Sequence, residues 1–436
     1  MNEIARQLNK EMERGNGYLI EMLSEIGKNL FFPKGILSQS AEAKLKAHRI
    51  NGTIGIAKEE GGIMHLPSIM ESVDGLLPEN SLTYAPSFGI PGLRKAWKEA
   101  MYEKNPSLSG KEVSLPVVTC GITHAISVMA DVWIDPGDVV ILPDMMWGNY
   151  NLILSVRKGA TLSKFSLFTE EGGFNLDAFQ AKVTEEAARR DKIIVLLNFP
   201  LNPTGYTVTR TEAARIVDIL EDVAKGGTNV VAVTDDAYFG LFYEEEVLKE
   251  SIFSLLTGRH ERLVAVKMDG ATKEDYVWGL RVGFLTYGIS ACDNQAAIYD
   301  ALEKKTAGAV RGSISNASHL SQSIVLKAMQ TPGYQESKEA KGEILKARAN
   351  KVGEVSMDPR YADAWSVYPF NSGYFMCIRL TNTDAETLRI HLLDTYGVGL
   401  ISLGETDLRV AFSCIDIQDI RELFDTIYKG VQDLAG

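Results

Sequence analysis

The sequence predicts an α/β protein built on a mostly parallel sheet, and one pattern in the middle of the chain carries this prediction. Between about residues 110 and 290, short β-branched runs alternate with amphipathic helical stretches, which is typical of βα units. The runs have the composition of buried strands, as strands covered on both faces do. These runs are Leu115–Thr119, Val139–Leu142, Ile193–Leu197, Val230–Thr234 and Leu263–Val266.

The two ends of the chain have a different pattern. Residues 1–30 are expected to be helical, because Ile4, Leu8 and Met12 repeat at a spacing of four, and glycines near residue 16 divide two helices. After about residue 330 the pattern predicts a smaller α+β unit. Its expected elements are a helix at 339–350, strands at 373–380 and 408–413, and a terminal helix at 416–433.

The composition disfavours several classes of protein. The chain has 436 residues, of which 45% are hydrophobic, and its net charge of −12 is unlike that of a nucleic-acid binder or a polybasic membrane anchor. The charged N-terminus lacks a signal-peptide core, and no apolar stretch reaches the ~18–20 residues that span a bilayer. The four cysteines form no CxxC pair, and the six histidines show no metal-ligand spacing. We therefore expect a cytoplasmic protein with no metal site and no nucleic-acid or membrane partner.

Ligands of parallel sheets bind beyond the carboxyl ends of the strands, so the residues after each run are the candidates for chemistry. After the first run, Gly121–Ala125 turns into a helix, whose free N–H groups form a phosphate cradle to which Thr123 adds a hydroxyl. An ordinary helix cap is the alternative. After the second run, Trp147 is placed either to stack on a planar ring or to pack against the core.

The third and fourth runs end in polar residues. Two prolines stiffen the loop that contains Asn202–Gly205, and this holds Asn202 as a positioned amide donor, although turn chemistry alone explains such a loop equally well. The fourth run ends in two carboxylates. Asp235 continues the strand and is expected to lie deepest, so it needs a cationic partner, whereas Asp236 is expected to be solvated or to cap a helix.

The fifth run is followed by a lysine in a loop of small residues. Lys273 follows Ala271 and Thr272, and Arg281 heads the next strand eight residues later. Lys267 is the rival lysine, but it lies within the strand run. A solvated surface lysine is the alternative interpretation of Lys273.

Taken together, these motifs resemble those of the class I/II aminotransferases of fold type I, in particular the aspartate/aromatic group, which use pyridoxal 5'-phosphate. The resemblance covers roughly residues 55–415. It implies a large domain with a mostly parallel seven-stranded sheet over residues 61–329, and a smaller α+β domain from residues 1–60 and 330–436. The matching elements, in chain order, are Tyr84 to Gly89, Gly121–Ala125, Asn202–Gly205, Asp235 with Tyr238, Lys273 with Arg281, and Arg409.

The resemblance also implies roles for single residues around the cofactor ring. Lys273 resembles the Schiff-base lysine, which holds the cofactor as an aldimine and then moves the substrate proton. Asp235 resembles the partner of the pyridine nitrogen, whose charge keeps the ring an electron sink. Tyr238 and Asn202 resemble the donors to the ring phenolate oxygen, and Trp147 resembles the aromatic residue that stacks on the ring. Asn202 and Trp147 are also expected to border the substrate.

Other matches concern the phosphate and the substrate carboxylate. Gly121, Ile122 and Thr123 resemble the helix start that binds the cofactor phosphate, and Arg281 resembles the phosphate-binding arginine. Arg409 resembles the arginine that binds the substrate α-carboxylate with both arms of its guanidinium group, which lysine cannot copy.

Two further matches imply a homodimer with shared active sites. Tyr84 resembles the tyrosine that reaches the phosphate in the neighbouring subunit. Arg311, in the segment Arg311–Asn316, resembles the arginine that crosses the dimer interface to bind the distal carboxylate of aspartate, glutamate or 2-oxoglutarate. The alternative for Arg311 is a surface residue of a helix. The functional interpretation favours dicarboxylic substrates, while aromatic ones remain open because that group accommodates both.

Three positions depart from the family pattern. Gly270 replaces the usual serine, so one phosphate contact is lost or is supplied by Thr272. Tyr276 replaces a small residue, and the segment Gly55–Ala57 matches the substrate-covering loop only weakly.

The resemblance predicts an aminotransferase that moves an amino group between an L-amino acid, namely aspartate, glutamate or an aromatic amino acid, and a 2-oxo acid such as 2-oxoglutarate. A β-lyase or decarboxylase of the same fold stays open, because the same lysine and aspartate serve those reactions. A transcription regulator is disfavoured, because the leader is short and mixed in charge.

Overall fold

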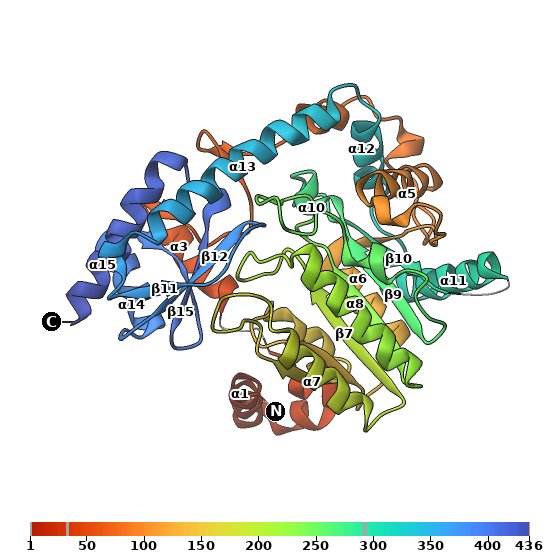
Figure 1. Ribbon diagram of the computed structural model, residues 1–436, viewed down its shortest axis with the longest axis horizontal. Coiled ribbons are helices and arrows are strands. Elements are labelled where there is room, and N and C mark those ends of the chain that lie inside the picture. Colours follow the sequence, from red (N-terminus) through yellow and green to blue (C-terminus); the bar gives the residue numbers. More distant parts are fainter. Residues whose placement is uncertain (1, 32–34, 291–293, 436) are drawn as a thin grey trace.

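A seven-stranded sheet forms the centre of the computed structural model, which describes residues 2–31, 35–290 and 294–435 (Figure 1). Five neighbouring strands, from β9 to β6, pair in parallel, whereas β10 runs antiparallel to both of its neighbours, β9 and β4. This confirms the predicted α/β class. In spatial order the strands are β4 (Val117–Cys120), β10 (Val282–Gly288), β9 (Leu263–Asp269), β8 (Asn229–Asp235), β7 (Lys192–Asn198), β5 (Val139–Pro143) and β6 (Thr161–Phe165).

The strands are apolar along their whole length because both faces of the sheet are covered. Ile194 and Leu196 of β7 belong to one hydrophobic core, and Ile193 and Val195 belong to the other, as the alternation of side chains in a strand requires. Helices α7 (Leu176–Ala187), α8 (Arg210–Lys225) and α9 (Ile252–Leu256) pack on one face, and α6 (Gly121–Trp133) packs on the other, beside α11 (Gln295–Ile314).

A second sheet of four antiparallel strands forms the core of the smaller α+β unit. In spatial order its strands are β11 (Trp365–Val367), β12 (Phe375–Leu380), β15 (Asp407–Ala411) and β14 (Ile401–Leu403). Helices α13 (Tyr334–Ser356), α14 (Ala385–Tyr396) and α15 (Ile420–Ala435) accompany it. In Figure 1, α13 runs as one helix from the neighbourhood of α12 to this second sheet.

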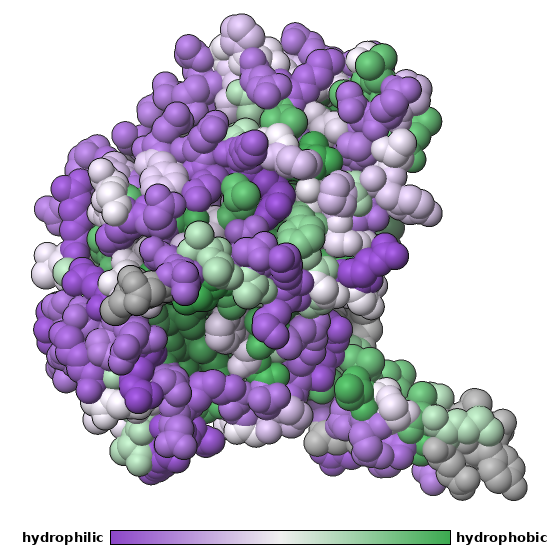
Figure 2. Space-filling model, turned by 90° about the vertical axis from the view of Figure 1, so that its right-hand side faces the viewer, coloured by the Kyte–Doolittle hydropathy of each residue, from purple (hydrophilic) through white to green (hydrophobic). Residues whose placement is uncertain are grey.

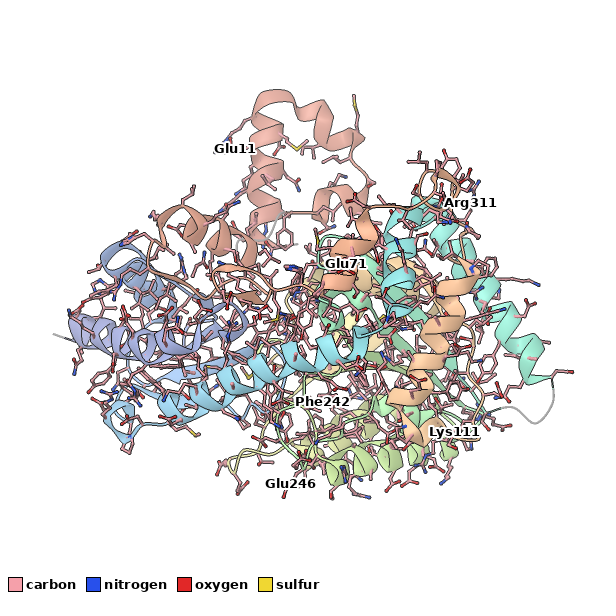
Figure 3. The ribbon with its side chains drawn as sticks, turned by 90° about the horizontal axis from the view of Figure 1, so that it is seen from above. Glu11, Glu71, Lys111, Phe242, Glu246 and Arg311 are labelled. Carbon is pink, nitrogen blue, oxygen red and sulfur yellow. The ribbon has the colours of Figure 1, made fainter. Side chains whose placement is uncertain are left out.

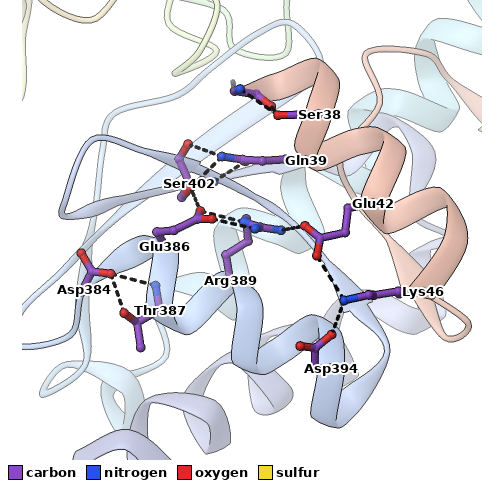
Figure 4. Close-up of polar contacts among 11 residues, drawn as sticks. Ser38, Gln39, Glu42, Lys46, Asp384, Glu386, Thr387, Arg389, Asp394 and Ser402 are labelled. Carbon is purple, nitrogen blue, oxygen red and sulfur yellow. Dashed lines mark hydrogen bonds and ion pairs between the residues drawn. The ribbon is translucent and has the colours of Figure 1, made fainter. Parts of the chain in front are cut away.

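Segments from the N-terminal and C-terminal parts of the chain meet in the smaller unit. Strand β1 (Ile50–Asn51) pairs in parallel with β13 (Val398–Gly399), and α3 (Ile36–Lys46) binds α14 and β14 through polar side chains (Figure 4). Arg389 of α14 lies 3.1 Å from Glu42, and Gln39 donates to Ser402 Oγ at 2.9 Å. The domain limits of 60 and 330 stay a prediction.

The first two helices stand apart from both sheets. Helices α1 (Glu3–Met22) and α2 (Glu25–Asn29) contact each other and project from the body as a narrow arm (Figures 2 and 3). The predicted break near residue 16 is wrong, since α1 runs through it. Isolated glycines cost a helix only about 1 kcal/mol each, which the rest of the helix tolerates.

The remaining elements are short or connect the two units. Among the described residues, no helix combines the length and the apolar character that a membrane crossing requires. The remaining helices and strands are β2 (Lys58–Glu59), β3 (Gly62–Ile63), α4 (Pro67–Val73), α5 (Pro91–Lys104), α10 (Ala271–Glu274) and α12 (His319–Met329). A π-helical segment spans Asn151–Val156, and 3₁₀ turns lie at Pro78–Asn80, Pro106–Leu108, Pro359–Tyr361, Phe412–Cys414 and Ile417–Asp419.

Element limits near the C-terminus differ from the prediction by a few residues. The strand expected at 408–413 ends at Ala411, and the terminal helix starts at Ile420 rather than 416. Arg348 explains both shifts, because its guanidinium group donates to the carbonyl of Ser413 and pairs with Asp416, which holds the connecting segment in turns.

Candidate active site

A pocket lies beyond the carboxyl ends of β5, β7, β8 and β9, where residues of both sheets meet. The large sheet supplies most of its wall, and β12, β15 and the N-terminal segment supply the rest. This is the position that an open parallel sheet offers a ligand. The lining residues are Ile36, Gly55, Ile122, Thr123, Trp147, Tyr150, Asn198, Asn202, Asp235, Ala237, Tyr238, Thr272, Lys273, Arg281, Phe375 and Arg409.

The predicted cofactor residues other than Tyr84 thus gather at one pocket, and Gly121 lies at its edge. Gly121 adopts φ +72°, and a Cβ atom built on it would lie 2.5 Å from Nη2 of Arg281. Only glycine combines this backbone conformation with so close a guanidinium group. The N-terminus of α6 and Arg281 therefore face the same small volume, beside the hydroxyl of Thr123.

Asp235 lies at the end of β8 and is 3% exposed. Its Oδ2 accepts a hydrogen bond from the Tyr150 hydroxyl at 2.6 Å, and its Oδ1 accepts one from the backbone N–H of Ala237 at 3.1 Å. Burial raises the pKa of this carboxyl, while the bond from Tyr150 and the charge of Lys273 act in the opposite direction. The carboxylate is thus held rigidly beside the pocket.

Lys273 is the only lysine that lines this pocket in the described part of the chain. Burial lowers the pKa of its amine to about 8, against the attraction of Asp235, and Arg281 lowers it further. The ammonium nitrogen lies 4.8 Å from the centre of the Tyr238 ring. An amine with a pKa near 8 is neutral in a usable fraction of molecules at neutral pH, so it can act as a nucleophile and as a base.

The residues before Lys273 fit a phosphate group. Thr272 lines the pocket, and its buried Oγ1 has no hydrogen-bond partner among the described residues. Gly270, where the family has serine, has no room for a side chain, because a Cβ atom there would lie 2.6 Å from the carbonyl oxygen of Val282. The close passage of β10 explains the glycine. An unsatisfied hydroxyl beside Arg281 and a helix N-terminus is what a bound phosphate would satisfy.

Arg409 is 2% exposed and belongs to the pocket wall. Its Nη1 donates to Asn202 Oδ1 at 3.2 Å and its Nη2 donates to the carbonyl of Thr53 at 3.0 Å, while Nε has no partner. The guanidinium group lies 4.2 Å from the centre of the Phe375 ring. No carboxylate of the described residues pairs with this buried cation, so a carboxylate ligand would complete it.

Tyr238 and Asn202 adjoin Arg409. Burial raises the pKa of the Tyr238 hydroxyl above its usual range, although Arg409 opposes the shift, so this hydroxyl stays protonated and can donate. The backbone N–H of Asn202 donates to Asn198 Oδ1 at 3.0 Å, which fixes the loop after β7. Trp147 lines the pocket and packs edge-on against Tyr150, with ring centres 5.5 Å apart.

The expectation for Asp236 is wrong. Asp236 is 3% exposed, lies 2.8 Å from Lys267, and accepts a hydrogen bond from Ser251 Oγ at 2.6 Å. Lys267 also lies 2.6 Å from Asp269. A lysine within an apolar strand needs a buried counter-charge, which Asp236 and Asp269 supply.

Tyr84 and Arg311 do not line the pocket of their own subunit. Tyr84 is 91% exposed, and Arg311 is exposed near the end of α11 (Figure 3). Their two segments are joined, because Ser87 Oγ donates to the carbonyl of Ser315 at 2.8 Å and Thr83 lies 3.0 Å from the His319 ring. Both side chains therefore belong to one exposed face.

Sequence reasoning missed several residues of the wall. Tyr150, Asn198 and Phe375 were not singled out, although Tyr150 holds Asp235 and Asn198 holds Asn202. Tyr150 follows Trp147 by three residues, which is one helical turn, and that spacing was the available signal. Phe375 had no local signal. Gly55 lines the pocket, so the weak match at 55–57 lies where a substrate-covering segment would be.

Comparison with known proteins identifies the family. The model for aminotransferase class I and II matches residues 53–427. The chain belongs to the class I and II aminotransferases. These enzymes use pyridoxal 5'-phosphate, the group that the pocket fits, and the chain is therefore an aminotransferase.

Individual relatives are distant. A probable N-acetyl-LL-diaminopimelate aminotransferase of Bacillus subtilis (strain 168) is 24% identical over 80% of this chain and 82% of its own. An aspartate aminotransferase of Bacillus sp. (strain YM-2) is 27% identical over 61% of this chain and 63% of its own. A crystal structure of an aminotransferase from Anaerococcus prevotii DSM 20548 has a TM-score of 0.84 at 23% identity, covering 94% of this chain and 98% of that one.

Proposed function

We propose that this aminotransferase moves the amino group of a dicarboxylic amino acid, aspartate or glutamate, to a 2-oxo acid such as 2-oxoglutarate, and that it also accepts aromatic amino acids. The observation that carries the proposal is the shared exposed face of Tyr84 and Arg311. An exposed arginine beside a face suited to dimer formation can supply the cation that a distal carboxylate needs. The similarity to an aspartate aminotransferase supports this choice.

The pocket residues divide the work of this reaction. Pyridoxal phosphate supplies a ring that accepts electrons when the bond to the substrate α-hydrogen breaks. Asp235 would keep the ring nitrogen protonated, and Tyr150 keeps Asp235 in place. Lys273 would take the proton from the substrate α-carbon and move it during the transfer, which its pKa of about 8 suits. Arg409 binds the α-carboxylate and orients that hydrogen toward the lysine.

The phosphate is assigned to a second group of residues. Thr272, Arg281 and Thr123 would hold it, together with the N–H groups at the start of α6. Trp147 would cover one face of the ring. None of these residues transfers a proton, and their role is to fix the ring against Lys273.

We also propose that the enzyme acts as a homodimer whose subunits share their active sites. The face that carries Tyr84 holds exposed apolar side chains, since Leu82 is 82% exposed, Leu77 is 62% exposed and Met70 is 56% exposed. They lie on or beside α4 and the turn Pro78–Asn80, both of which α12 contacts. A second copy that covered this face would receive Tyr84 and Arg311 at its own pocket.

The proposed location is the cytoplasm. Cys120, Cys377 and Cys414 are free thiols, and a reducing compartment keeps such thiols reduced. The fourth cysteine, Cys292, lies outside the described residues.

The first experiment follows the cofactor of the purified enzyme. Aspartate or glutamate should convert the bound cofactor from its yellow aldehyde form to the colourless amine form, and a 2-oxo acid should reverse this change. Release of pyruvate, ammonia or carbon dioxide instead of a paired 2-oxo acid would indicate a lyase or a decarboxylase and would refute the proposed reaction.

The shared site is tested with mixed subunits. Arg311→Ala should lower kcat/KM for aspartate and glutamate by about ten- to hundredfold and leave an aromatic substrate less affected, with Lys304→Ala on the same helix as the matched control. A heterodimer of one Lys273→Ala subunit and one Arg311→Ala subunit contains one complete pocket only if Arg311 crosses the interface. Recovery of dicarboxylate turnover therefore supports the arrangement, and no recovery contradicts it.

A further inference from the structure

The turn that carries Lys273 is too short to be stable alone. Helix α10 has four residues, no side chain caps its N-terminus, and Tyr276 follows it with φ +57°. One helical turn gains little from its own hydrogen bonds, and a left-handed tyrosine adds strain. Contacts from outside the turn must therefore hold Lys273 in the pocket.

Two carboxylates directly after Lys273 supply these contacts. The side chains of Glu274 and Asp275 are 6% and 0% exposed. Lys338 of α13 lies 2.9 Å from Glu274 Oε1 and 2.8 Å from Asp275 Oδ1, so one ammonium group binds both. Tyr334, one turn earlier on α13, donates to Asp275 at 2.5 Å.

Glu274 and Lys338 stabilise each other's charged forms. Burial alone would raise the pKa of Glu274, but Lys104 and Lys338 lower it to about 2. Asp275 and Glu274 in turn keep Lys338 protonated against its own desolvation. The junction is thus a buried ion cluster whose second lysine, Lys104, comes from α5.

The same face of α13 reaches the other wall of the pocket. Tyr334, Lys338, Lys341, Leu345 and Arg348 follow one another at spacings of four, three, four and three residues, so they form one stripe along the helix. Leu345 in the middle is fully buried. Figure 1 shows α13 spanning the distance between the two sheets.

The far end of the stripe contacts the segments that hold Arg409. Lys341 donates to Glu59 at 2.5 Å, and Arg348 donates to the carbonyl of Ser413 at 2.6 Å. Ser413 Oγ in turn donates to the carbonyl of Ile56, beside Gly55 of the pocket wall. One helix face therefore contacts the lysine turn at one end and the surroundings of the carboxylate-binding arginine at the other.

We propose that Lys338 is a positioning residue for Lys273, and that α13 sets the distance between Lys273 and Arg409. Lys338 binds neither substrate nor cofactor. It acts through Glu274 and Asp275, the two residues that directly follow the reactive lysine. The proposal rests on the proposed role of Lys273, which the loss of the visible cofactor band in Lys273→Ala tests independently.

The decisive variant is Lys338→Met, with Lys338→Arg as the conservative change and Lys304→Met, an exposed ion-pair residue of α11, as the control. The holoenzyme of Lys338→Met should show a kcat lowered by about ten- to hundredfold with a smaller change in KM, because a small displacement of a reacting group costs this much. The pH titration of the visible cofactor band should shift, because the displaced Lys273 would lie in different surroundings. Lys338→Arg should restore most of both values.

A purely structural role predicts something else. If Lys338→Met lowers only the melting temperature, while kcat and the titration of the cofactor band match those of the wild type, the proposal is overturned. Should Lys338→Met not fold, Asp275→Asn decides, because it leaves Lys338 paired with Glu274 and keeps an acceptor for Tyr334. It should shift the band titration in the same direction by a smaller amount, and an unchanged titration would equally refute the proposal.

Discussion

Lys267 and Lys273 lie six residues apart, at the end of β9 and just beyond it, yet their chemistry differs completely. Lys267 is 2% exposed and lies between Asp236 and Asp269, whose charges raise its pKa although burial alone would lower it. Lys273 forms no ion pair with any described residue, and burial lowers its pKa to about 8. Burial acts in the same direction on both amines, so the difference lies in the counter-charges.

The same contrast separates the polar groups around the two lysines. Just after β8, the carboxylate of Asp236 pairs with Lys267 and accepts a hydrogen bond from Ser251. In the pocket wall, Thr272 Oγ1 and Arg409 Nε are buried, and no described residue bonds to either atom. Buried polar groups without partners are costly to a fold, and a ligand bound in this pocket could supply the missing interactions of these two.

The largest effect is expected when the unpaired lysine is removed. Lys273→Ala should lower turnover by about 10³- to 10⁴-fold and abolish the visible cofactor band, because the residue is both nucleophile and proton carrier. Steady-state kinetics and absorption spectra measure this. Retention of the band would assign the cofactor linkage to another lysine and break the contrast with Lys267.

The paired lysine should matter to stability instead. Lys267→Met leaves Asp236 and Asp269 without their shared cation, which should cost about 3–5 kcal/mol in the free energy of unfolding by urea. The double variant Lys267→Met with Asp236→Asn should recover part of this loss. A single variant as stable as the wild type would mean that the cluster does not stabilise the fold.

A smaller effect is expected from the phosphate side of the pocket. Thr272→Val should weaken cofactor binding by about tenfold, because its unpaired hydroxyl then cannot donate to a charged oxygen. Thr272→Ser is the matched control and should bind almost as the wild type does. Fluorescence titration of the cofactor-free enzyme gives both affinities, and equal values for Val and Ser would contradict the assignment.

The mildest test needs no substitution. Attachment of the cofactor requires the neutral amine of Lys273, whose fraction falls about tenfold for each pH unit below its pKa. The rate of band formation by cofactor-free enzyme should therefore rise with pH and level off above about 8. A rate that still rises toward pH 10 would mean that the pKa of Lys273 is that of an ordinary lysine, and the contrast with Lys267 would be lost.

Much of the fold and of the site could be predicted because both depend on local patterns. The five apolar runs correspond to β4, β5, β7, β8 and β9, and the residues after them line the pocket. Local patterns failed at Asp236. In the sequence, Asp235 and Asp236 are two adjacent carboxylates with nothing to distinguish them, and only Lys267 of the neighbouring strand β9 shows that Asp236 is the ion-paired one. They also missed Phe375, which comes from the second sheet.

The sequence by itself determined which residues end the strands and in which order they occur along the chain. Because the carboxyl ends of parallel strands lie at one edge of a sheet, this order was enough to place Asp235 and Lys273 together. Arg281 joins them because it precedes β10, and β10 runs antiparallel to its neighbours, which the tertiary structure decided. The tertiary structure alone decided which charges are paired. Electrostatic pairing acts over a few ångströms. Lys267 pairs with Asp236, which follows β8, and Glu274 pairs with lysines of α5 and α13, whereas no carboxylate of the described residues pairs with Arg409.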